Sequence, residues 1–223
     1  MSSEAATRAG AAPRPASART LTDRFLAAVP LLTVFVWLAI LYAWEAWDHA
    51  TPWLFTDELL LAQLGRSIAH TGHPALRGEP YSFHSLYPVI TAPGWWLPTA
   101  ADGYAAVKYI GVFAVSLTIF PAYLLARLVA STRAALAAAA AATAIPAVVY
   151  SSFVIEEPVA YPWATLCLYL MAKALLRGGR RWWIAATVAS VTAPFINGAL
   201  IPIPGILDLS ALFMAWSRER GRR

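Results

Sequence analysis

Long uncharged stretches constrain this chain more than any other feature of its sequence. Residues 25–44 contain no charged side chain, and residues 105–126 contain a single lysine near their start. Each stretch is long enough to cross about 30 Å of hydrocarbon as a helix. Residues 134–150 and 159–176 are slightly shorter but adequate, and a longer apolar stretch covers residues 182–216. The sequence therefore predicts an all-α, polytopic membrane protein.

The overall composition agrees with this prediction. The chain is 59% hydrophobic and 13% charged, with a mean hydropathy of +0.57, which is too apolar for an ordinary soluble domain. The first stretch is longer than the apolar core of a secretory signal, about 7–15 residues, so it should stay as an anchor. The lone Cys167 excludes an intrachain disulfide.

Basic residues gather on one side when these stretches are threaded alternately through a membrane. Fourteen of the seventeen lysines and arginines fall on that side. They are Arg8, Arg14, Arg19, Arg24, Arg127, Arg133, Lys173, Arg177, Arg180, Arg181, Arg218, Arg220, Arg222 and Arg223. Because positive charge is retained at the cytoplasmic side, we expect a multi-pass plasma-membrane protein with a cytoplasmic amino terminus. Such a basic face favours the anionic lipid of the inner leaflet.

The opposite side is acidic. Only Arg66, Arg77 and Lys108 lie there among the basic residues, whereas eight of the twelve carboxylates fall in residues 45–104 or 151–158. The net charge of +5 therefore hides an acidic outer face. The arginines are scattered at span ends and form no single stripe with aromatic residues, so we expect no nucleic-acid partner.

The apolar stretches define three regions of the chain. Residues 1–24 should be a disordered cytoplasmic tail, residues 25–216 the membrane domain, and residues 217–223 a basic cytoplasmic tail. The stretch 182–216 is too long for one span and too short for two, and Pro194, Pro202, Pro204 and Gly205 interrupt it. Because the basic tail should stay cytoplasmic, we expect a bent helical hairpin that turns near residues 197–205.

The external segment, residues 45–104, carries helical signals of its own. Thr56 can cap a helix whose first turn contains Asp57 and Glu58, where negative charge favours the helix dipole, and Gly72 should end it. Leucines along one face indicate that this helix lies in the membrane interface. A second interfacial piece is expected at residues 81–96, anchored by its tryptophan pair.

Two acidic pairs share the outer side of the threading. Asp57 and Glu58 follow the first span, and Glu156 and Glu157 follow the third. A carboxylate can take the proton of an acceptor hydroxyl during sugar transfer, and a second one can orient the acceptor or hold a divalent cation. Ordinary solvated acids of an external loop are the alternative interpretation.

Several other side chains of the outer side are candidates for binding. Arg66 and Arg77 can pair with a donor phosphate bidentately, and Lys108 can extend to the outer interface. Three histidines, His70, His73 and His84, share the first external segment with carboxylates and are weak candidates for a zinc site. The sequence contains no P-loop, dinucleotide-binding or zinc-protease motif, which removes the functions that depend on them.

A series of short motifs follows the predicted spans in order. They are Thr56-Asp57-Glu58, Ser85-Leu86-Tyr87-Pro88, Ala92-Pro93, Phe120-Pro121-Ala122-Tyr123-Leu124-Leu125-Ala126-Arg127, Val149-Tyr150-Ser151-Ser152 and Glu156-Glu157-Pro158-Val159-Ala160-Tyr161-Pro162. With these motifs the chain resembles, over roughly residues 25–185, the amino-terminal part of GT-C-type membrane glycosyltransferases. That family includes protein O-mannosyltransferases, aminoarabinose transferases and their actinobacterial relatives.

The resemblance implies a GT-C-like helical bundle that transfers a sugar from a polyprenyl-phosphate-linked donor to an acceptor at the outer membrane face. It assigns the catalytic base or metal-linked acid to Asp57 and the second carboxylate to Glu157, with Glu58 and Glu156 beside them. Tyr87 belongs to a motif near the expected substrate. The implied partners are the lipid-linked donor and membrane lipid, and a divalent cation is a possible cofactor.

A function of a different class also remains open. The chain can be a non-catalytic membrane subunit, or a remnant of a GT-C module, that packs against further helices of a longer or partner chain. A transporter is disfavoured because the spans lack central charges and an obvious inverted repeat. The sugar and the acceptor have no signal in the sequence.

Overall fold

The computed structural model describes residues 21–48, 56–82, 85–150 and 153–220. The elements in chain order are α1 (Leu21–Asp48), α2 (Thr56–Thr71), β1 (Ala75–Leu76), β2 (Glu79–Pro80), α3 (Tyr87–Thr91), η1 (Ala92–Trp96), α4 (Ala100–Ser116), α5 (Ile119–Ala126), α6 (Thr132–Tyr150), α7 (Glu157–Arg177), α8 (Arg180–Ile196), η2 (Gly198–Leu200) and α9 (Pro202–Arg220). The prediction of a mainly helical chain is confirmed. One correction to the all-α class is the short antiparallel hairpin β1–β2.

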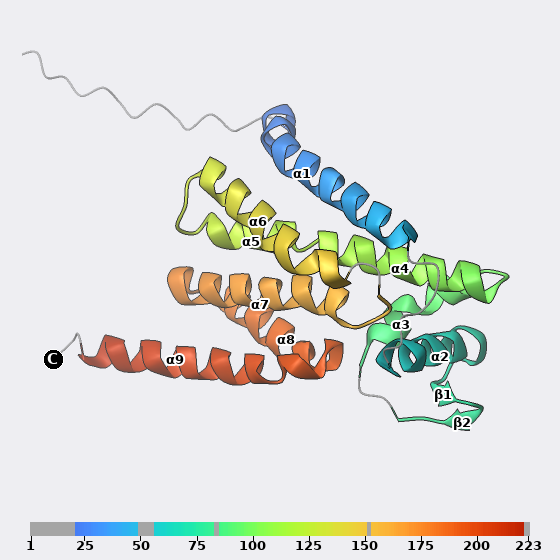
Figure 1. Cartoon of the computed structure of the whole chain (residues 1–223). Helices are drawn as coiled ribbons and strands as arrows, with labels where there is room; N and C mark the ends of the chain where they lie inside the picture. Colours follow the sequence, from blue (N-terminus) through green and yellow to red (C-terminus); the bar gives the residue numbers. More distant parts are fainter. Residues whose placement is uncertain (1–20, 49–55, 83–84, 151–152, 221–223) are drawn as a thin grey trace, which may run out of the picture.

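The long helices form a bundle in which α1, α4 together with α5, α6, α7, α8 and α9 alternate in direction (Figure 1). Neighbouring pairs that contact one another include α1 with α4, α5 with α6, and α7 with α8, and α8 also contacts α9. At one end of the bundle, α1 finishes, α7 begins and α2, β1, β2, α3 and η1 pack together. We call it the acidic end, because Asp57, Glu58, Glu156 and Glu157 lie there.

The other end of the bundle collects the basic residues. The α5–α6 and α7–α8 connections and the end of α9 lie there (Figure 1). We call it the basic end; its described residues include Arg127, Arg133, Lys173, Arg177, Arg180, Arg181 and Arg220. The two ends of the bundle thus carry opposite charge, as the alternate threading of the sequence predicts.

Within the described residues, four segments are long and apolar enough to cross a membrane: Ala28–Trp47, Ala100–Ala126, Glu157–Arg177 and Gly198–Ser217. The prediction of membrane-spanning helices is confirmed at this level. The segment Ala100–Ala126 comprises α4 and α5 together. The helices α6 and α8 lie in the same bundle and cover the predicted third span and the first half of the predicted hairpin.

The helix boundaries differ from the predicted spans by a few residues. The helix α1 continues to Asp48, and α4 begins at Ala100 instead of residue 105. Thr99 explains the earlier start, because its side chain caps α4 by accepting the Asp102 N–H at 3.1 Å. The predicted basic tail is partly helical, since α9 extends to Arg220; residues 1–20 and 221–223 lie outside the described residues.

The last apolar stretch is divided into two helices. The helix α8 ends at Ile196, and the Asn197 side chain accepts the Ala199 N–H at 2.7 Å to cap the short η2. The helix α9 then begins at Pro202, which suits the first helical position because proline has no N–H to satisfy there. Pro204 and Gly205 were expected to interrupt the chain but lie in the first turn of α9, where an N–H has no helical partner to lose.

Residues 56–82 and 85–99 form a packed unit with short helices. The helix α2 covers Thr56–Thr71, so Thr56 is its first residue and does not stand before it as the expected cap. Gly72 follows with a φ of 78° and ends the helix, as the sequence predicts. The short α3 and η1 then replace the predicted second interfacial piece, and both contact α2.

Trp95 holds this unit against the bundle. Its side chain is only 6% exposed, so the prediction that both tryptophans anchor at the membrane surface is wrong for Trp95. A Cβ on Gly65 of α2 would lie 2.8 Å from the indole nitrogen, and one on Gly103 of α4 would lie 2.7 Å from a ring carbon. The absence of side chains at these glycines therefore lets α2 and α4 close on the ring. Trp96 is 69% exposed.

Candidate functional site

Glu58 connects three segments of the acidic end. Its side chain is fully buried, and its Oε1 accepts the Tyr104 hydroxyl at 3.2 Å and the Val154 N–H at 2.9 Å. These bonds join α2 to α4 and to the segment before α7. A buried carboxylate needs such donors, because its burial without them costs on the order of several kcal/mol of folding free energy. The geometry therefore gives Glu58 a structural position and turns it away from the surface where an acceptor would arrive.

Lys108 is also part of the interior. It lies one turn after Tyr104 on α4 and is 4% exposed, and its Nζ donates to the Ala46 carbonyl at 2.7 Å. Its ammonium lies 5.6 Å from the centre of the Tyr104 ring and within range of the charge of Glu58. The prediction that Lys108 extends to the outer interface is wrong, because a backbone carbonyl of α1 and a nearby carboxylate hold the ammonium inside.

Glu156, in the second acidic pair, is half-buried. Burial raises the pKa of Glu156, the hydrogen bond with Ser85 opposes that change, and the negative charges of Glu157 and Asp57 raise the pKa further. The charge of Asp57, at the start of α2, therefore acts on a carboxyl that immediately precedes α7. The structure therefore brings members of the two acidic pairs together.

Ser85 links the segments around this meeting point. Its Oγ donates to the Ile196 carbonyl at 3.1 Å and accepts the Tyr87 N–H at 3.1 Å. A hydroxyl has one proton, which can turn either to this carbonyl or to Glu156. The Leu86 N–H also donates to the Phe195 carbonyl, at 2.6 Å. The end of α8 is thereby fixed beside α3 and the beginning of α7.

Tyr87 lies beneath these acids. Its side chain is fully buried, and its hydroxyl has no hydrogen-bond partner among the described residues. Burial raises the pKa of Tyr87 well above its usual range, and the nearby Tyr104, Glu58, Glu156 and Glu157 raise it further. A fully buried hydroxyl without a partner is uncommon in folded proteins. Tyr87 therefore lies in the interior of the acidic end. The prediction that Tyr87 contacts substrate at the surface does not fit this position.

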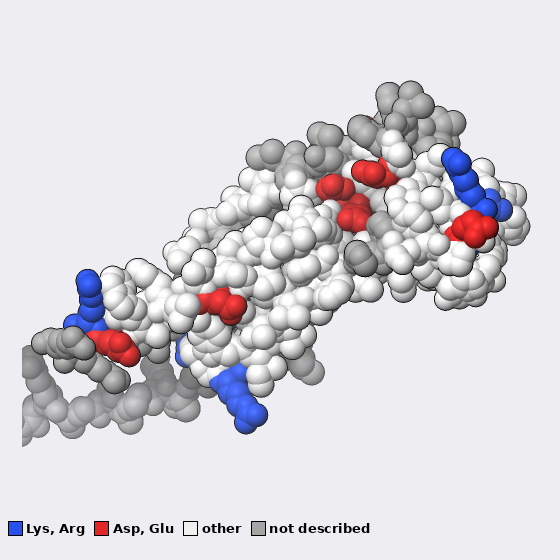
Figure 2. Space-filling view, turned by 90° about the horizontal axis from the view of Figure 1, so that it is seen from below, with Lys and Arg blue, Asp and Glu red and all other residues white. Residues whose placement is uncertain are grey.

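We call Asp57, Glu156 and Glu157 the acidic cluster. Asp57 is exposed, whereas Glu156 and Glu157 are partly buried. Figure 2 shows a group of acidic side chains midway along the visible face with no basic side chain beside it, whereas the basic side chains near the two extremities have acidic ones next to them. The cluster offers carboxylates from α2 and from the start of α7 at one place, which is an arrangement that can accept a proton or hold a cation.

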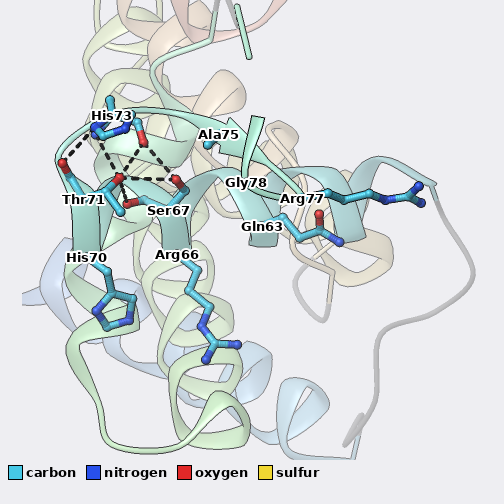
Figure 3. Close-up of a pocket in the computed structure, with 9 residues that line it drawn as sticks. All are labelled: Gln63, Arg66, Ser67, His70, Thr71, His73, Ala75, Arg77 and Gly78. Atoms are coloured by element: carbon cyan, nitrogen blue, oxygen red, sulfur yellow. Dashed lines mark hydrogen bonds between the residues drawn. The ribbon is translucent and has the colours of Figure 1, made fainter. Parts of the chain in front are cut away.

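The predicted phosphate-binding arginines do not join the acidic cluster. Arg66 follows Asp57 by nine residues, which is two and a half helical turns at 3.6 residues per turn, so the two side chains leave opposite faces of α2. Arg77 lies at the tip of the β1–β2 hairpin. Both arginines line a polar cavity of about 400 Å³ beside α2, drawn in Figure 3. Sequence reasoning had grouped them with the acids only because they share one side of the membrane.

The histidines lie in the same polar cavity. His70 and His73 line it, and His73 Nδ1 is 2.9 Å from the Thr71 carbonyl. No group of three or more His, Cys, Asp or Glu side chains placed to hold a metal occurs within the residues that the structure describes. His84, the third weak zinc candidate, lies outside them. A divalent cation at the acidic cluster stays a prediction.

Sequence reasoning missed two residues that organise this end. Ser85 belongs to a motif that was recognised, and its place two residues before Tyr87 allows its Oγ to accept that N–H. Tyr104 shows no comparable signal, since it is an ordinary aromatic residue at the start of a span. Comparisons with known proteins add no relative: no family model, curated protein or solved structure matches the chain.

Proposed function

We propose that this protein is a GT-C-like membrane glycosyltransferase that moves a sugar from a polyprenyl-phosphate donor to a hydroxyl acceptor. The observation that carries the proposal is the acidic cluster, in which carboxylates of α2 and of the start of α7 meet at one end of membrane-length helices. A donor with a lipid tail presents its head group at that level of the bilayer. The motifs described above support the same assignment.

Asp57 is the general base of the proposed reaction. It is the exposed member of the cluster and lies in the first turn of α2. Asp57 takes the proton of the acceptor hydroxyl, whose oxygen attacks the anomeric carbon of the sugar. The bond between that carbon and the phosphate oxygen breaks, and the lipid phosphate leaves with the electron pair. Attack from the side opposite the phosphate inverts the anomeric centre.

The remaining carboxylates of the cluster have supporting roles. Glu157, the first residue of α7, orients the acceptor; a divalent cation, where the reaction needs one, would be held by Glu157 and Asp57 and would offset the negative charge of the leaving phosphate. Glu156 lies beside the Ser85 hydroxyl and is partly buried, so it helps to form the wall of the site. Glu58 and Lys108 support the site from inside and do not touch substrate in this proposal.

The orientation of the protein follows from the charge difference between the two ends. The basic end faces the cytoplasm and the acidic end faces outward, because basic residues are retained on the cytoplasmic side. The amino terminus is then cytoplasmic and the site opens outside the plasma membrane. A lipid-linked donor is suited to that location, since it carries an activated sugar where soluble nucleotide sugars are absent.

Reconstitution of the full chain into proteoliposomes tests the proposal. Radiolabelled polyprenyl-phosphate hexoses and pentoses are supplied in the bilayer, and label released to water or to an added glycoside acceptor is counted. We expect Asp57→Asn to lower release about 10²–10⁴-fold, as for loss of a general base. The matched control Glu79→Gln removes an exposed carboxylate of β2 and should leave the rate unchanged. Equal release from wild type and Asp57→Asn would exclude the mechanism.

The non-catalytic alternative rests on the exposed apolar surface of the last two helices. Large apolar side chains remain exposed along α8 and α9, including Phe195 at 53%, Leu209 at 68% and Phe213 at 64%. Lipid covers such a surface in a membrane, but helices of another subunit would cover it equally well. If wild-type proteoliposomes release no sugar from any of the donors while a tagged chain retains a stable membrane partner, the subunit assignment replaces the enzyme.

A further inference from the structure

Two cavities meet on the face of α2 that points away from the acidic cluster. The polar cavity of about 400 Å³ is lined by basic and hydroxyl side chains, among them Arg66, His70 and Arg77. The second cavity, of about 420 Å³, is mostly apolar; it is lined by Leu59, Ala62, Trp95, Ala101 and Tyr104 among others. Gln63 and Arg66 belong to both. The polar cavity, with its basic side chains, thus adjoins the apolar cavity, and Arg66 lies where the two meet.

The apolar cavity lies at the boundary of a membrane-length segment. Ala100 and Ala101, which line it, are the first residues of the span Ala100–Ala126. Groups at that level of a membrane protein meet lipid head groups on one side and hydrocarbon on the other. The polar cavity is therefore placed at head-group depth, and the apolar cavity faces the beginning of the acyl chains.

The hydroxyls around the polar cavity are engaged with the backbone. Ser67 donates to the His73 carbonyl at 2.9 Å, and Thr71 donates to the Ser67 carbonyl at 2.8 Å (Figure 3). Arg66 and His70 point to the same side of α2, one turn apart, while Arg77 extends from the hairpin (Figure 3). The turn that follows α2 is thereby fixed, and the basic side chains are the groups presented to a ligand.

Arg77 has an unusual backbone conformation. The pairing of Leu76 with Glu79 makes Arg77 and Gly78 a two-residue hairpin loop, with φ values of 53° and 90°. Both values are positive, as in a type I′ turn, whose first position favours asparagine or glycine. An arginine here costs local stability, and such an outlier points to a role for its side chain.

We infer that these paired cavities bind an anionic phospholipid of the bilayer. Arg66 pairs with the phosphate, Arg77 adds a second positive charge from the hairpin, and an acyl chain occupies the apolar cavity beside Trp95 and Ala101. Charge complementarity selects an anionic head group over a zwitterionic one. The site faces away from Asp57, so this lipid is not the sugar donor, and the inference does not depend on the proposed enzymatic function.

Native mass spectrometry of the full chain in detergent tests the inference. Dioleoyl phosphatidylglycerol is titrated against dioleoyl phosphatidylcholine, and sn-glycerol 3-phosphate serves as the head group without chains. We expect one phosphatidylglycerol to bind about tenfold more tightly than phosphatidylcholine or glycerol phosphate. Equal binding of the two lipids would overturn the inference. Equal binding of glycerol phosphate would also overturn it and assign the cavity to a soluble phosphate.

Variants separate the two halves of the site. Arg66→Gln should weaken phosphatidylglycerol binding about tenfold and Arg66→Lys should restore part of it, whereas Arg133→Gln, an exposed change at the basic end, should have no effect. Ala101→Trp should fill the apolar cavity and weaken lipid binding, and the matched Ala134→Trp should not. If Arg66→Gln and Arg133→Gln bind phosphatidylglycerol alike, the site is not where we place it.

Arg77→Asn distinguishes ligand binding from folding. Asparagine suits the type I′ position better than arginine, so the thermal midpoint of this variant should stay equal or rise. Its affinity for phosphatidylglycerol should nevertheless fall severalfold, because one of the two guanidinium groups is lost. A fall in thermal midpoint with unchanged lipid affinity would show that Arg77 serves the fold, contrary to the inference.

Discussion

The two ends of the bundle hold their charges in different ways. At the acidic end, Glu58 and Lys108 are buried and bonded to the Tyr104 hydroxyl, the Val154 N–H and the Ala46 carbonyl. At the basic end, the cations lie over aromatic rings near the surface. Lys173 Nζ is 5.2 Å and the Arg181 guanidinium 5.1 Å from the Trp182 ring centre, and the Arg220 guanidinium is 4.1 Å from that of Trp216.

The buried charges of the acidic end contribute to the stability of the fold, whereas the exposed charges of the basic end set the orientation of the protein in the membrane. When one partner of a buried charge is removed, the remaining charge stays in a medium of low polarity without compensation. Such a substitution therefore destabilises the packing of the whole acidic end. An exposed cation over an aromatic ring gains about 0.5–1 kcal/mol and keeps most of its hydration. Substitution of buried charges at the acidic end should therefore lower the free energy of unfolding strongly. Substitution of the cations at the basic end should change it little, but should change the orientation of the protein in the membrane.

The largest expected effect is that of Glu58→Ala. The substitution leaves the Tyr104 hydroxyl and the Val154 N–H without their acceptor and removes the carboxylate near Lys108. We expect a loss of about 3–5 kcal/mol in stability, or no folded protein. Thermal unfolding in detergent, followed by tryptophan fluorescence, measures it. Glu79→Ala is the exposed control, and similar midpoints for the two variants would contradict a structural role for Glu58.

A matched pair of lysines compares the two ends directly. Lys108→Met removes the donor to the Ala46 carbonyl and the cation near Glu58, so it should cost about 2–4 kcal/mol. Lys173→Met removes a cation that lies over Tyr169 and Trp182 and should cost less than about 1 kcal/mol. The difference between the two thermal midpoints is the test. Equal costs would mean that burial does not distinguish the ends.

The sequence predicted elements defined by local signals. The helix that carries Asp57 and Glu58 in its first turn and its end at Gly72 follow from neighbouring residues. The segregation of basic residues follows from their order along the chain. The phase of Arg66 relative to Asp57 was also available, since nine residues place them on opposite faces of any α-helix. Assigning residues only to a side of the membrane, without regard to their position around the helix, grouped Arg66 with Asp57, although the fold separates them.

The sequence did not predict hydrogen bonds between residues that are distant along the chain. Glu58 is bonded to Val154, 96 residues later, and Lys108 to Ala46, 62 residues earlier. Nothing local marks these pairs, so Lys108 was assigned to the interface because lysines in spans usually reach it. Trp95 was placed at the membrane surface for the same kind of reason, although the glycines that receive its ring lie in α2 and α4.

Packing at the acidic end can be tested without changing charge. A Cβ on Gly103 would lie 2.7 Å from a carbon of the Trp95 ring, whereas a Cβ on Gly198 meets nothing within 4 Å. Gly103→Ala should therefore destabilise the protein by about 1–3 kcal/mol, and Gly198→Ala should not destabilise it measurably. Thermal midpoints of the two variants give the comparison. Equal midpoints would mean that Trp95 moves aside without cost.

A smaller effect is expected from Glu156, and it should depend on pH. The pKa of this carboxyl is raised in the folded protein above the ordinary value of 4.5. Its ionisation therefore disfavours the folded state as pH rises through the folded pKa, and the cost is absent below the unfolded value. Glu156→Gln should raise the thermal midpoint at pH 7 and lose this gain below pH 4.5.

The control for this pH dependence is Glu79→Gln, which removes an equal charge from an exposed position of β2. Thermal midpoints of wild type and the two variants are compared across the acidic range. A gain that is the same in both variants would trace to net charge and not to the burial of Glu156. A gain for Glu156→Gln that persists at low pH would contradict the raised pKa.

The smallest effect on stability is expected for Arg180→Gln with Arg181→Gln. Both arginines are exposed in the first turn of α8, where the positive end of the helix dipole disfavours cations. The contact of Arg181 with the Trp182 ring offsets this cost, so the net stability does not explain the two arginines, and the thermal midpoint should change by less than about 0.5 kcal/mol equivalent. Orientation does explain them, since basic residues at this end oppose translocation.

Removal of further basic residues should expose that role. With Arg133→Gln and Arg177→Gln added to the pair, we expect a mixed orientation while the folded bundle remains stable, because every substituted side chain is at the exposed basic end. An impermeant maleimide reports it in intact cells: Asp102→Cys should be labelled and Ser131→Cys protected in the parent chain, and Ser131→Cys should become partly labelled in the quadruple variant. Protection that persists, together with a lowered thermal midpoint, would show that the basic end serves the fold after all, and the contrast between the two ends would fail.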